Sequence, residues 1–367
     1  MENLPFKIEI KSLLTDRMET VECKTVLRSV PGARAVYDAA WQNRPVIIKV
    51  FSNRFNARRN AKKEWQGLNS LQKLKINSPS PLFYGNTDRK CWAVITEKIT
   101  GSSTTIELFN SAGDTKRKFD LLSLVCRELA VQNEAGILQK DLHLGNFLVR
   151  DDRIFAIDPA QMRFYGRPLN KTESLSQLSF LAWCLSGDDG LIQSLGEQYF
   201  SCRRWKLEIA DELLLKKKIA SHRKKIIRKN LAKTLRTSSR YQKIRSGQYL
   251  AVFDRGFIGA ADPELFLRQI DSLMDAGQIV KRDAVFFVSV IEWNGRKVAI
   301  KRYNHQGFFQ SLCETIKGSG AKQSWLYGHS LQMSGAPVVK SLAFIELRKG
   351  LLLRQSYIIT EFISSGD

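Results

Sequence analysis

The chain has 367 residues, enough for two domains of ordinary size, and its hydrophobic content of 43% is that of a globular protein. Its longest apolar runs, such as residues 284–288, have only the length of a β-strand, so the sequence excludes a membrane-spanning helix. The formal net charge of +22 favours anionic partners.

The N-terminal segment and the cysteines both indicate the cytoplasm. Residues 1–13 alternate charged and apolar side chains and lack the continuous apolar core of a secretory signal. The six cysteines are scattered without a C-x-x-C pair, which is typical of reduced thiols and not of a disulfide framework or a zinc site. We therefore expect a cytosolic protein.

The first third of the chain predicts strands, one helix and further strands. Residues 46–51 form a β-rich run that contains Lys49, residues 58–74 have helical periodicity, and residues 93–99 are again strand-like. The glycine and two serines at 101–103 then break the pattern.

The middle of the chain predicts helices on either side of a polar loop. Apolar residues recur at helical spacing over residues 114–134, and residues 174–185 look helical as well. Between these segments, residues 147–149 and 154–157 have the composition of two short strands.

Lys49 needs a reason to lie within a hydrophobic strand, because burial of an unpaired ammonium group is costly. Glu64, fifteen residues further on in the predicted helix, is the best-placed carboxylate to pair with it. The alternative is a lysine whose stem packs on the sheet edge while its ammonium group reaches water. The polar residues downstream favour the paired, functional interpretation.

The polar loop places three side chains suited to phosphoryl transfer in a fixed order. Asp141 is followed by Asn146 after five residues and by Asp158 after a further twelve. In phosphoryl transfer from ATP, one carboxylate takes the proton of the acceptor hydroxyl, while an amide and a second carboxylate coordinate Mg²⁺. Such residues are also common in turns, so one turn alone would prove little. The ordered combination predicts an ATP- and Mg²⁺-dependent site with Asp141, Lys49 and Glu64 as catalytic residues and Asn146 and Asp158 as metal ligands.

The part of the site that would cover the nucleotide is less defined. Residues 29–34 precede the lysine strand at a suitable distance but hold a single glycine, Gly32, our candidate for a phosphate-covering turn. We expect Glu97 and Ile99 to lie at a hinge where backbone groups bind the adenine.

An internal repeat extends to the end of the chain. Three blocks recur in the same order, which argues against chance. Residues 46–51, 61–65 and 93–101 are matched by residues 298–303, 321–325 and 357–366.

These residues resemble the bacterial lipopolysaccharide kinases that phosphorylate Kdo or heptose of the inner core. The resemblance rests on residues 141–149, on Ile157 and Asp158, on the Lys49 strand, and on the repeated blocks. Aminoglycoside kinases, choline kinases and atypical protein kinases share the same motif set, so the resemblance specifies the fold better than the substrate.

The resemblance implies an α+β, protein-kinase-like two-lobed fold with an ATP–Mg²⁺ site in the cleft between the lobes. We expect a complete domain over residues 1–246, with an N-terminal lobe at about 1–98 and a C-terminal lobe at about 102–246. Residues 247–367 would form the N-terminal lobe of a second domain, an antiparallel sheet plus a helix, whose C-terminal lobe is absent.

Three departures from the family pattern bear on activity. Gln139 stands where the family usually has a histidine, whose role in kinase folds is chiefly structural. Asp158 is followed by Pro159 and Ala160 instead of Phe-Gly, which favours a small, sugar-like acceptor over a regulated protein kinase. In the second copy Ser324 takes the place of Glu64.

The positive charge is concentrated between Arg203 and Arg245, where sixteen lysines and arginines accompany three acidic residues, a net of +13. Apolar residues at helical spacing predict a helix over 213–235, so the charges could simply form its solvated face. The one-sided charge favours contact with lipopolysaccharide core glycolipid or with the anionic inner face of the bacterial inner membrane. Nucleic acid is disfavoured, because few aromatic residues are interleaved with the basic ones.

The sequence thus predicts a kinase that phosphorylates a Kdo or heptose hydroxyl of the lipopolysaccharide core. Two alternatives stay open: an atypical protein kinase, and a pseudokinase or scaffold, which the glycine-poor turn, Gln139 and the half copy favour.

Overall fold

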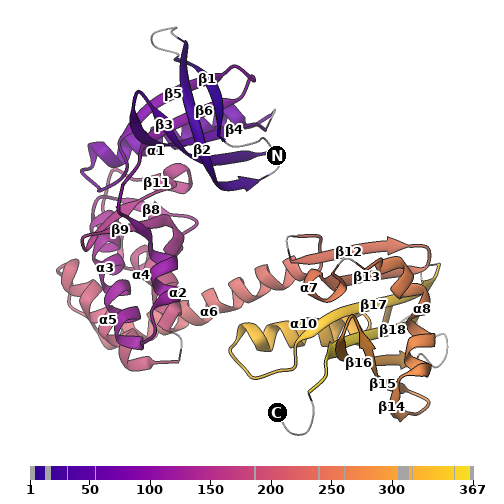
Figure 1. Ribbon diagram of the computed structural model, residues 1–367. Helices are drawn as coiled ribbons and strands as arrows, with labels where there is room; N and C mark the ends of the chain where they lie inside the picture. The colour runs from indigo at the N-terminus through magenta and orange to yellow at the C-terminus, as the bar shows by residue number, and fades with distance from the viewer. Residues whose placement is uncertain are drawn as a thin grey trace. The chain divides into compact units, whose positions relative to one another are not determined.

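The computed structural model describes residues 5–12, 18–30, 32–53, 55–185, 187–238, 240–259, 261–304, 314–315, 317–350 and 352–363. The structure is mixed α+β (Figure 1). It divides into two compact units, here called unit 1 (Met1–His222) and unit 2 (Arg223–Asp367).

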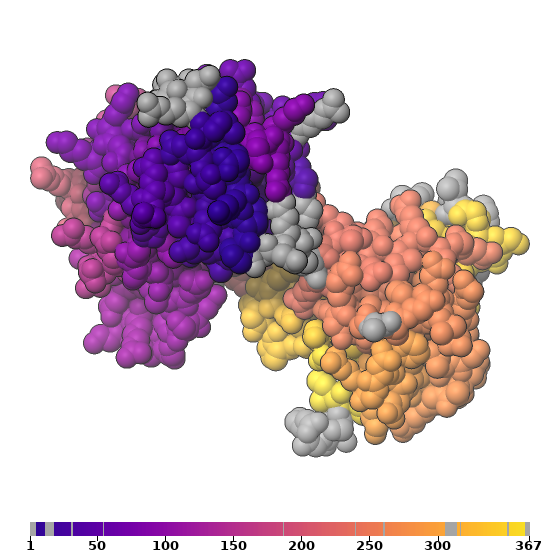
Figure 2. Space-filling view, turned by 45° about the horizontal axis from the view of Figure 1, so that its top comes forward, coloured from indigo at the N-terminus to yellow at the C-terminus, as the bar shows by residue number. Residues whose placement is uncertain are grey.

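Unit 1 begins with a closed barrel of six antiparallel strands, whose indigo surface is seen in Figure 2. Alternate side chains of the strands point inward and fill the barrel with apolar groups, among them Ile10, Val21, Val46, Ile48 and Ile95. Around the barrel the strands follow the order β1-β2-β3-β4-β6-β5. They are β1 (Phe6–Ser12), β2 (Met18–Val30), β3 (Arg34–Trp41), β4 (Arg44–Phe51), β5 (Pro81–Thr87) and β6 (Trp92–Glu97).

Helix α1 (Ala57–Lys73) confirms the helix predicted over 58–74. It packs on the outside of the barrel. Ala61 and Leu68 are buried there against Phe51 and Val94. The helix also contacts the turn that follows Asp158. The barrel is therefore connected through α1 to the remainder of unit 1.

The remainder of unit 1 is mainly helical, with two small sheets of order β10-β9-β7 and β11-β8. A large apolar core joins α3, α4 and α5 and includes Leu129, Phe147, Leu178 and Tyr199. The strand elements are β7 (Ser103–Thr104), β8 (Ile137–Gln139), β9 (Phe147–Arg150), β10 (Arg153–Ala156) and β11 (Met162–Phe164). The helices are α2 (Thr105–Ser111), α3 (Thr115–Glu134), α4 (Lys171–Ala182) and α5 (Asp189–Cys202), with 3₁₀ turns η1 (Leu144–Asn146), η2 (Pro159–Gln161) and η3 (Trp183–Leu185).

Helix α6 (Ile209–Thr234) contains most of the basic stretch and confirms the helix predicted over 213–235. Leu215 and Ile219 are buried, whereas Lys216 and Lys217 are exposed, so the helix is amphipathic over this part. Within the described part of the chain, no helix is both long and apolar enough to cross a membrane.

Unit 2 contains one antiparallel sheet of seven strands, in the order β12-β13-β17-β18-β16-β15-β14. Helices α8 and α10 cover opposite faces, because α8 packs with Ile345 and Ile359 while α10 packs with their neighbours Phe344 and Ile358. The strands are β12 (Tyr241–Ser246), β13 (Tyr249–Asp254), β14 (Gln278–Arg282), β15 (Phe286–Trp293), β16 (Arg296–Asn304), β17 (Ser341–Lys349) and β18 (Leu352–Glu361). The helices are α7 (Arg255–Ile258), α8 (Pro263–Ala276) and α10 (Gly320–Met333). Strand β12 belongs to this sheet although it precedes the domain boundary expected after residue 246.

The internal repeat is visible in the strand register. In unit 1, Val46 pairs with Glu97 and Lys49 with Val94. In unit 2, the equivalent strands β16 and β18 pair Val298 with Glu361 and Lys301 with Ile358. The two lysines of the repeat therefore occupy the same position in the same strand pair.

The repeat begins earlier than the sequence blocks indicated. Hairpin β3–β4 turns at Gln42 and Asn43, whose φ angles are 51° and 59°, and hairpin β15–β16 turns at Asn294 and Gly295 with φ angles of 50° and 71°. A tryptophan paired with an arginine flanks each turn. Positive φ at both central residues is the geometry of a type I′ turn, which matches the twist of the flanking strands.

Candidate active site

The Lys49 ammonium group joins two carboxylates that come from distant parts of unit 1. Nζ lies 2.5 Å from Oε1 of Glu64 on α1, and it also donates a hydrogen bond to Oδ1 of Asp158, which follows β10. Glu64 is buried and Lys49 is nearly so. The strand lysine is therefore paired as the sequence predicted, and the pair extends to Asp158.

For Lys49 and Asp158, the attraction of the neighbouring opposite charges together affects the pKa more than burial does. Burial would lower the pKa of Lys49, but Glu64 and Asp158 reverse the effect and raise that pKa above its usual value. Burial would raise the pKa of Asp158, but the Lys49 ammonium, assisted by Arg34 and Arg28, holds the pKa of that carboxyl below its usual range. Lys49 and Asp158 are thus both kept charged at neutral pH.

The polar loop is held by its own backbone. Nδ2 of Asn146 donates a hydrogen bond of 2.7 Å to the backbone carbonyl of Asp141, and the backbone N–H of Ile157 donates to the carbonyl of Asn146. The bond to Asp141 uses the side-chain nitrogen of Asn146, so the side-chain oxygen of Asn146 is the atom that could be a metal ligand. Asp158 itself has φ of 58°, a left-handed conformation that aspartate tolerates better than most residues.

A cavity of about 320 Å³ brings the predicted residues together. Glu64, Asp141, Asn146 and Asp158 all line it, and Lys49 lies beside it through its contacts with Glu64 and Asp158. Asp141 is an exposed residue of this lining. His143 lines the same cavity and is also exposed.

Three predicted nucleotide contacts lie elsewhere. Among the described residues that line this cavity, Gly32, Glu97 and Ile99 do not occur. Gly32 is at the tip of the β2–β3 turn, where its φ of 68° favours glycine. Glu97 is exposed at the end of β6, and Ile99 is buried just beyond it. Their role in nucleotide binding stays a prediction.

Two arginines of the cavity were missed by sequence reasoning. Arg28 on β2 and Arg34 at the start of β3 line it together with Lys63 of α1. The available signal was the alternation of side chains along the predicted strands, since Arg34 and Lys49 must share a face once their strands are paired in register.

Gln139 has a structural role. Its backbone N–H and C=O exchange hydrogen bonds with the side chain of Gln177, and its own Nε2 donates to Gln132 at 2.7 Å. Gln132 in turn donates to Glu128 at 2.8 Å. The buried glutamine therefore fixes the strand that leads into Asp141.

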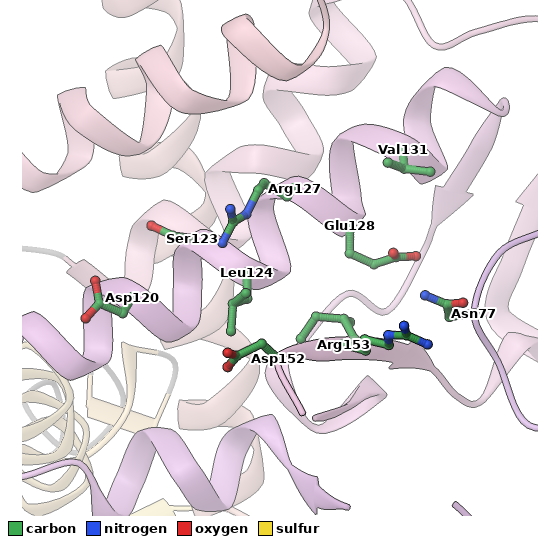
Figure 3. A pocket seen from close by; sticks show the side chains of 10 residues that line it. Asn77, Asp120, Ser123, Leu124, Arg127, Glu128, Val131, Asp152 and Arg153 are labelled. Carbon is green, nitrogen blue, oxygen red and sulfur yellow. The ribbon is translucent and has the colours of Figure 1, made fainter. Parts of the chain in front are cut away.

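A second cavity of unit 1, about 710 Å³, lies away from this cluster (Figure 3). It is lined by one side of α3 and by the β9–β10 turn, and Glu128 and Arg153 both point toward its Asn77 side. Burial raises the pKa of Glu128 to about 7, although its hydrogen bond from Gln132 acts in the opposite direction. The charges in this cavity are mixed, and they do not form the ordered set found around Lys49.

The equivalent position of unit 2 has different neighbours. The Lys301 ammonium group lies 4.1 Å from the ring centroid of Phe286 and 4.9 Å from that of Tyr303. Ser324, at the place of Glu64, shares a hydrogen bond of 2.8 Å with the Tyr303 hydroxyl. The second lysine is thus held against aromatic faces.

The donor set fits Mg²⁺ only if a nucleotide completes it. Among the described residues, no group of three or more His, Cys, Asp or Glu side chains could hold a metal ion. Asn146 and Asp158 offer two oxygen ligands on one cavity, which suits an ion that usually combines one or two protein ligands with waters and substrate phosphates.

Comparisons with known proteins do not establish a family. No protein-family model matches the sequence. No curated protein matches it either. Among solved structures, the chain is similar to the structure of vaccinia related kinase 3, with a TM-score of 0.39 and 12% identity over 60% of this chain and 86% of that chain. A likeness at this TM-score carries no weight for function.

Proposed function

We propose that unit 1 is an ATP- and Mg²⁺-dependent phosphotransferase with a protein-kinase-like, two-lobed fold, in which the barrel and α1 form one lobe and the helical part forms the other. The observation that carries this proposal is the Lys49 ammonium group, which joins Glu64 and Asp158 on the cavity that Asp141 and Asn146 also line. A purely structural ion pair would not require Asp141 and Asn146 on the same cavity.

Each residue of the site would have a distinct role. When bound, Mg²⁺–ATP would supply the γ-phosphoryl group and the positive charge that offsets its oxygens. Lys49, oriented by Glu64, would hold the nucleotide phosphates, and Asn146 and Asp158 would hold the metal. Asp141 would take the proton of the acceptor hydroxyl as that oxygen bonds to phosphorus and ADP leaves with the electrons of the broken P–O bond.

The proposed acceptor is a hydroxyl of Kdo or heptose in the lipopolysaccharide core. Two features support a small acceptor: the resemblance of the 141–149 motif to the core kinases, and Pro159 and Ala160 in place of Phe-Gly after Asp158. The basic residues of α6 would attract the anionic glycolipid or the inner face of the bacterial inner membrane.

Unit 2 would be a kinase-like N-terminal lobe without a phosphotransfer site of its own. The shared strand register and the shared hairpin turns support its relation to the barrel of unit 1. The aromatic neighbours of Lys301 and the serine at the place of Glu64 support its lack of catalysis.

The test is transfer of radiolabel from [γ-³²P]ATP with Mg²⁺ to dephosphorylated core oligosaccharide and, separately, to a protein acceptor. We expect labelled sugar, and Asp141→Asn should reduce its rate about 10²- to 10⁴-fold, the usual contribution of a general base. Asp151→Asn is the matched control, because Asp151 is exposed on the β9–β10 turn and away from the cavity lining.

Each outcome has a distinct meaning. Label on protein but not on sugar would make the chain an atypical protein kinase. ATP binding without transfer to either acceptor would make it a pseudokinase. If Mg²⁺–ATP does not bind at all, the phosphotransferase assignment is wrong.

A further inference from the structure

One face of strands β2, β3 and β4 presents three cations toward the active-site cavity. Across these strands Arg28 pairs with Val36, which pairs with Lys49. In the next row Val30 pairs with Arg34, which pairs with Phe51. Directly paired residues project from the same face of a sheet, so both arginines share the face of Lys49.

The two arginines differ from Lys49 in how their charge is used. Lys49 is neutralised by Glu64 and Asp158. Within the described residues, neither Arg28 nor Arg34 forms an ion pair, although both are near enough to Asp158 to interact with its charge. The cavity wall therefore holds guanidinium groups that are available to an anion.

The backbone beside them is poorly suited to bind phosphate. Glycine-rich loops hold phosphates with free backbone N–H groups. Here the N–H of Ala33 donates to the carbonyl of Val30 at 3.0 Å, and Gly32 is the single glycine of the turn. The N–H of Ala33 is therefore occupied within the turn, and side chains are the alternative donors.

We infer that Arg28 and Arg34 hold the terminal phosphates of the nucleotide, in place of the backbone amides of a glycine-rich loop. A guanidinium group is suited to this role, because its planar fork donates two parallel hydrogen bonds to phosphate oxygens. The inference rests on the proposed function, since it assigns a further part of the same ATP site.

Unit 2 provides an internal contrast. Phe286 occupies the position of Arg34. Arg34 pairs with Phe51, two residues after Lys49. In the same way Phe286 pairs with Tyr303, two residues after Lys301. Its ring packs on Lys301 instead of leaving a cationic pocket. The substitution Arg34→Phe therefore copies into unit 1 the change that unit 2 already carries.

The test measures binding, independently of catalysis, by calorimetric titration of the full chain with ATP, ADP and adenosine in the presence of Mg²⁺. Arg28→Ala and Arg34→Phe should each raise the Kd for ATP about 10-fold, and the double variant about 100-fold, with a smaller change for ADP. Adenosine binding should not change, which also shows that each variant is folded. Arg28→Lys and Arg34→Lys should give intermediate losses, since lysine keeps the charge but not the fork.

Arg44→Ala is the matched control, because Arg44 lies on the same sheet five residues along β4 from Lys49 and outside the cavity lining. Unchanged ATP affinity in the double variant would overturn the inference while leaving the proposed function intact. Loss of acceptor binding with normal ATP affinity would also overturn it, by assigning the arginines to the acceptor. If the wild-type chain binds no ATP, the proposed function fails first.

Discussion

Lys49 and Lys301 occupy the same place in two copies of one strand pair, yet their ammonium groups have opposite surroundings. Lys49 contacts two carboxylates, whereas Lys301 lies against two aromatic rings. A partly buried ammonium group needs compensation in either case, and carboxylates or ring faces can both supply it. The fold of the repeat therefore does not determine its chemistry, which depends on a few neighbours of the lysine.

We expect the largest effect, on the rate of phosphate transfer, from replacing one lysine and not the other. Lys49→Met should reduce phosphate transfer at least about 100-fold, because the phosphates lose one of their cations and Glu64 is left as an unpaired buried carboxylate. Lys301→Met, the matched change in unit 2, should leave transfer and ATP affinity unchanged. Rate measurements on both variants check the contrast, and equal losses would show that unit 2 takes part in the reaction.

The second prediction concerns stability as a function of pH. One buried group of unit 1 should lose its stabilising contribution as the pH rises, and one buried group of unit 2 as the pH falls. Burial raises the pKa of Glu128 to about 7 in unit 1 and lowers the pKa of His329 to about 4 in unit 2. The contribution of Glu128 to stability is fully present below about pH 4.5 and is lost as the pH rises through about 7. That of His329 is fully present above about pH 6.5 and is lost as the pH falls through about 4.

Urea unfolding between pH 4 and 8 tests this pair. Glu128→Gln should raise the free energy of unfolding by about 2 kcal/mol at pH 8 and change it little at pH 4.5. His329→Gln should remove the loss of stability below pH 6. Identical pH profiles for wild type and both variants would contradict the burial of these groups.

A third contrast lies at one matched position of helices α1 and α10, which is buried in unit 1 and exposed in unit 2. A Cβ on Gly67 would lie 2.8 Å from Cβ of Pro159, so Gly67→Ala should destabilise unit 1 by about 1–3 kcal/mol despite its better helix propensity. Its counterpart in α10 is Tyr327, since residues 61–65 match residues 321–325. Tyr327 is 68% exposed, and Tyr327→Ala should lower the free energy of unfolding by no more than about 0.5 kcal/mol. Thermal unfolding of both variants measures the difference; a neutral Gly67→Ala would mean that α1 does not approach η2 so closely.

The smallest effect is expected in the hairpin turns. Gln42 and Asn43 adopt left-handed conformations that Asn294 and Gly295 adopt more readily. Replacing Gln42-Asn43 by Asn-Gly should stabilise unit 1 by about 1 kcal/mol, and the reverse exchange in unit 2 should have the opposite sign. Chemical denaturation of the two exchanges would reveal whether the turns are equivalent; a destabilising Asn-Gly in unit 1 would show that they are not.

Much of the local structure could be predicted from the sequence. The strands around Lys49 and residues 93–99, the helices beginning near residues 58 and 115, and the basic helix all form where periodicity predicted them. The repeat was also recognisable, although the sequence blocks began at Val298 and missed the turn at Asn294. Sequence comparison does not reveal that turn, because Gln-Asn and Asn-Gly are different residue pairs that share one backbone conformation.

The sequence by itself determined which side chains could perform phosphoryl transfer and the order in which they occur, because spacing and residue type are local properties. Only the tertiary structure decided that Glu64 and Asp158 meet at one ammonium group, that Gln139 is held in a buried glutamine network, and that Arg28 and Arg34 face the same cavity. The physical reason is that these contacts join residues far apart in the chain, and their proximity follows from strand register and helix packing, which no single segment encodes.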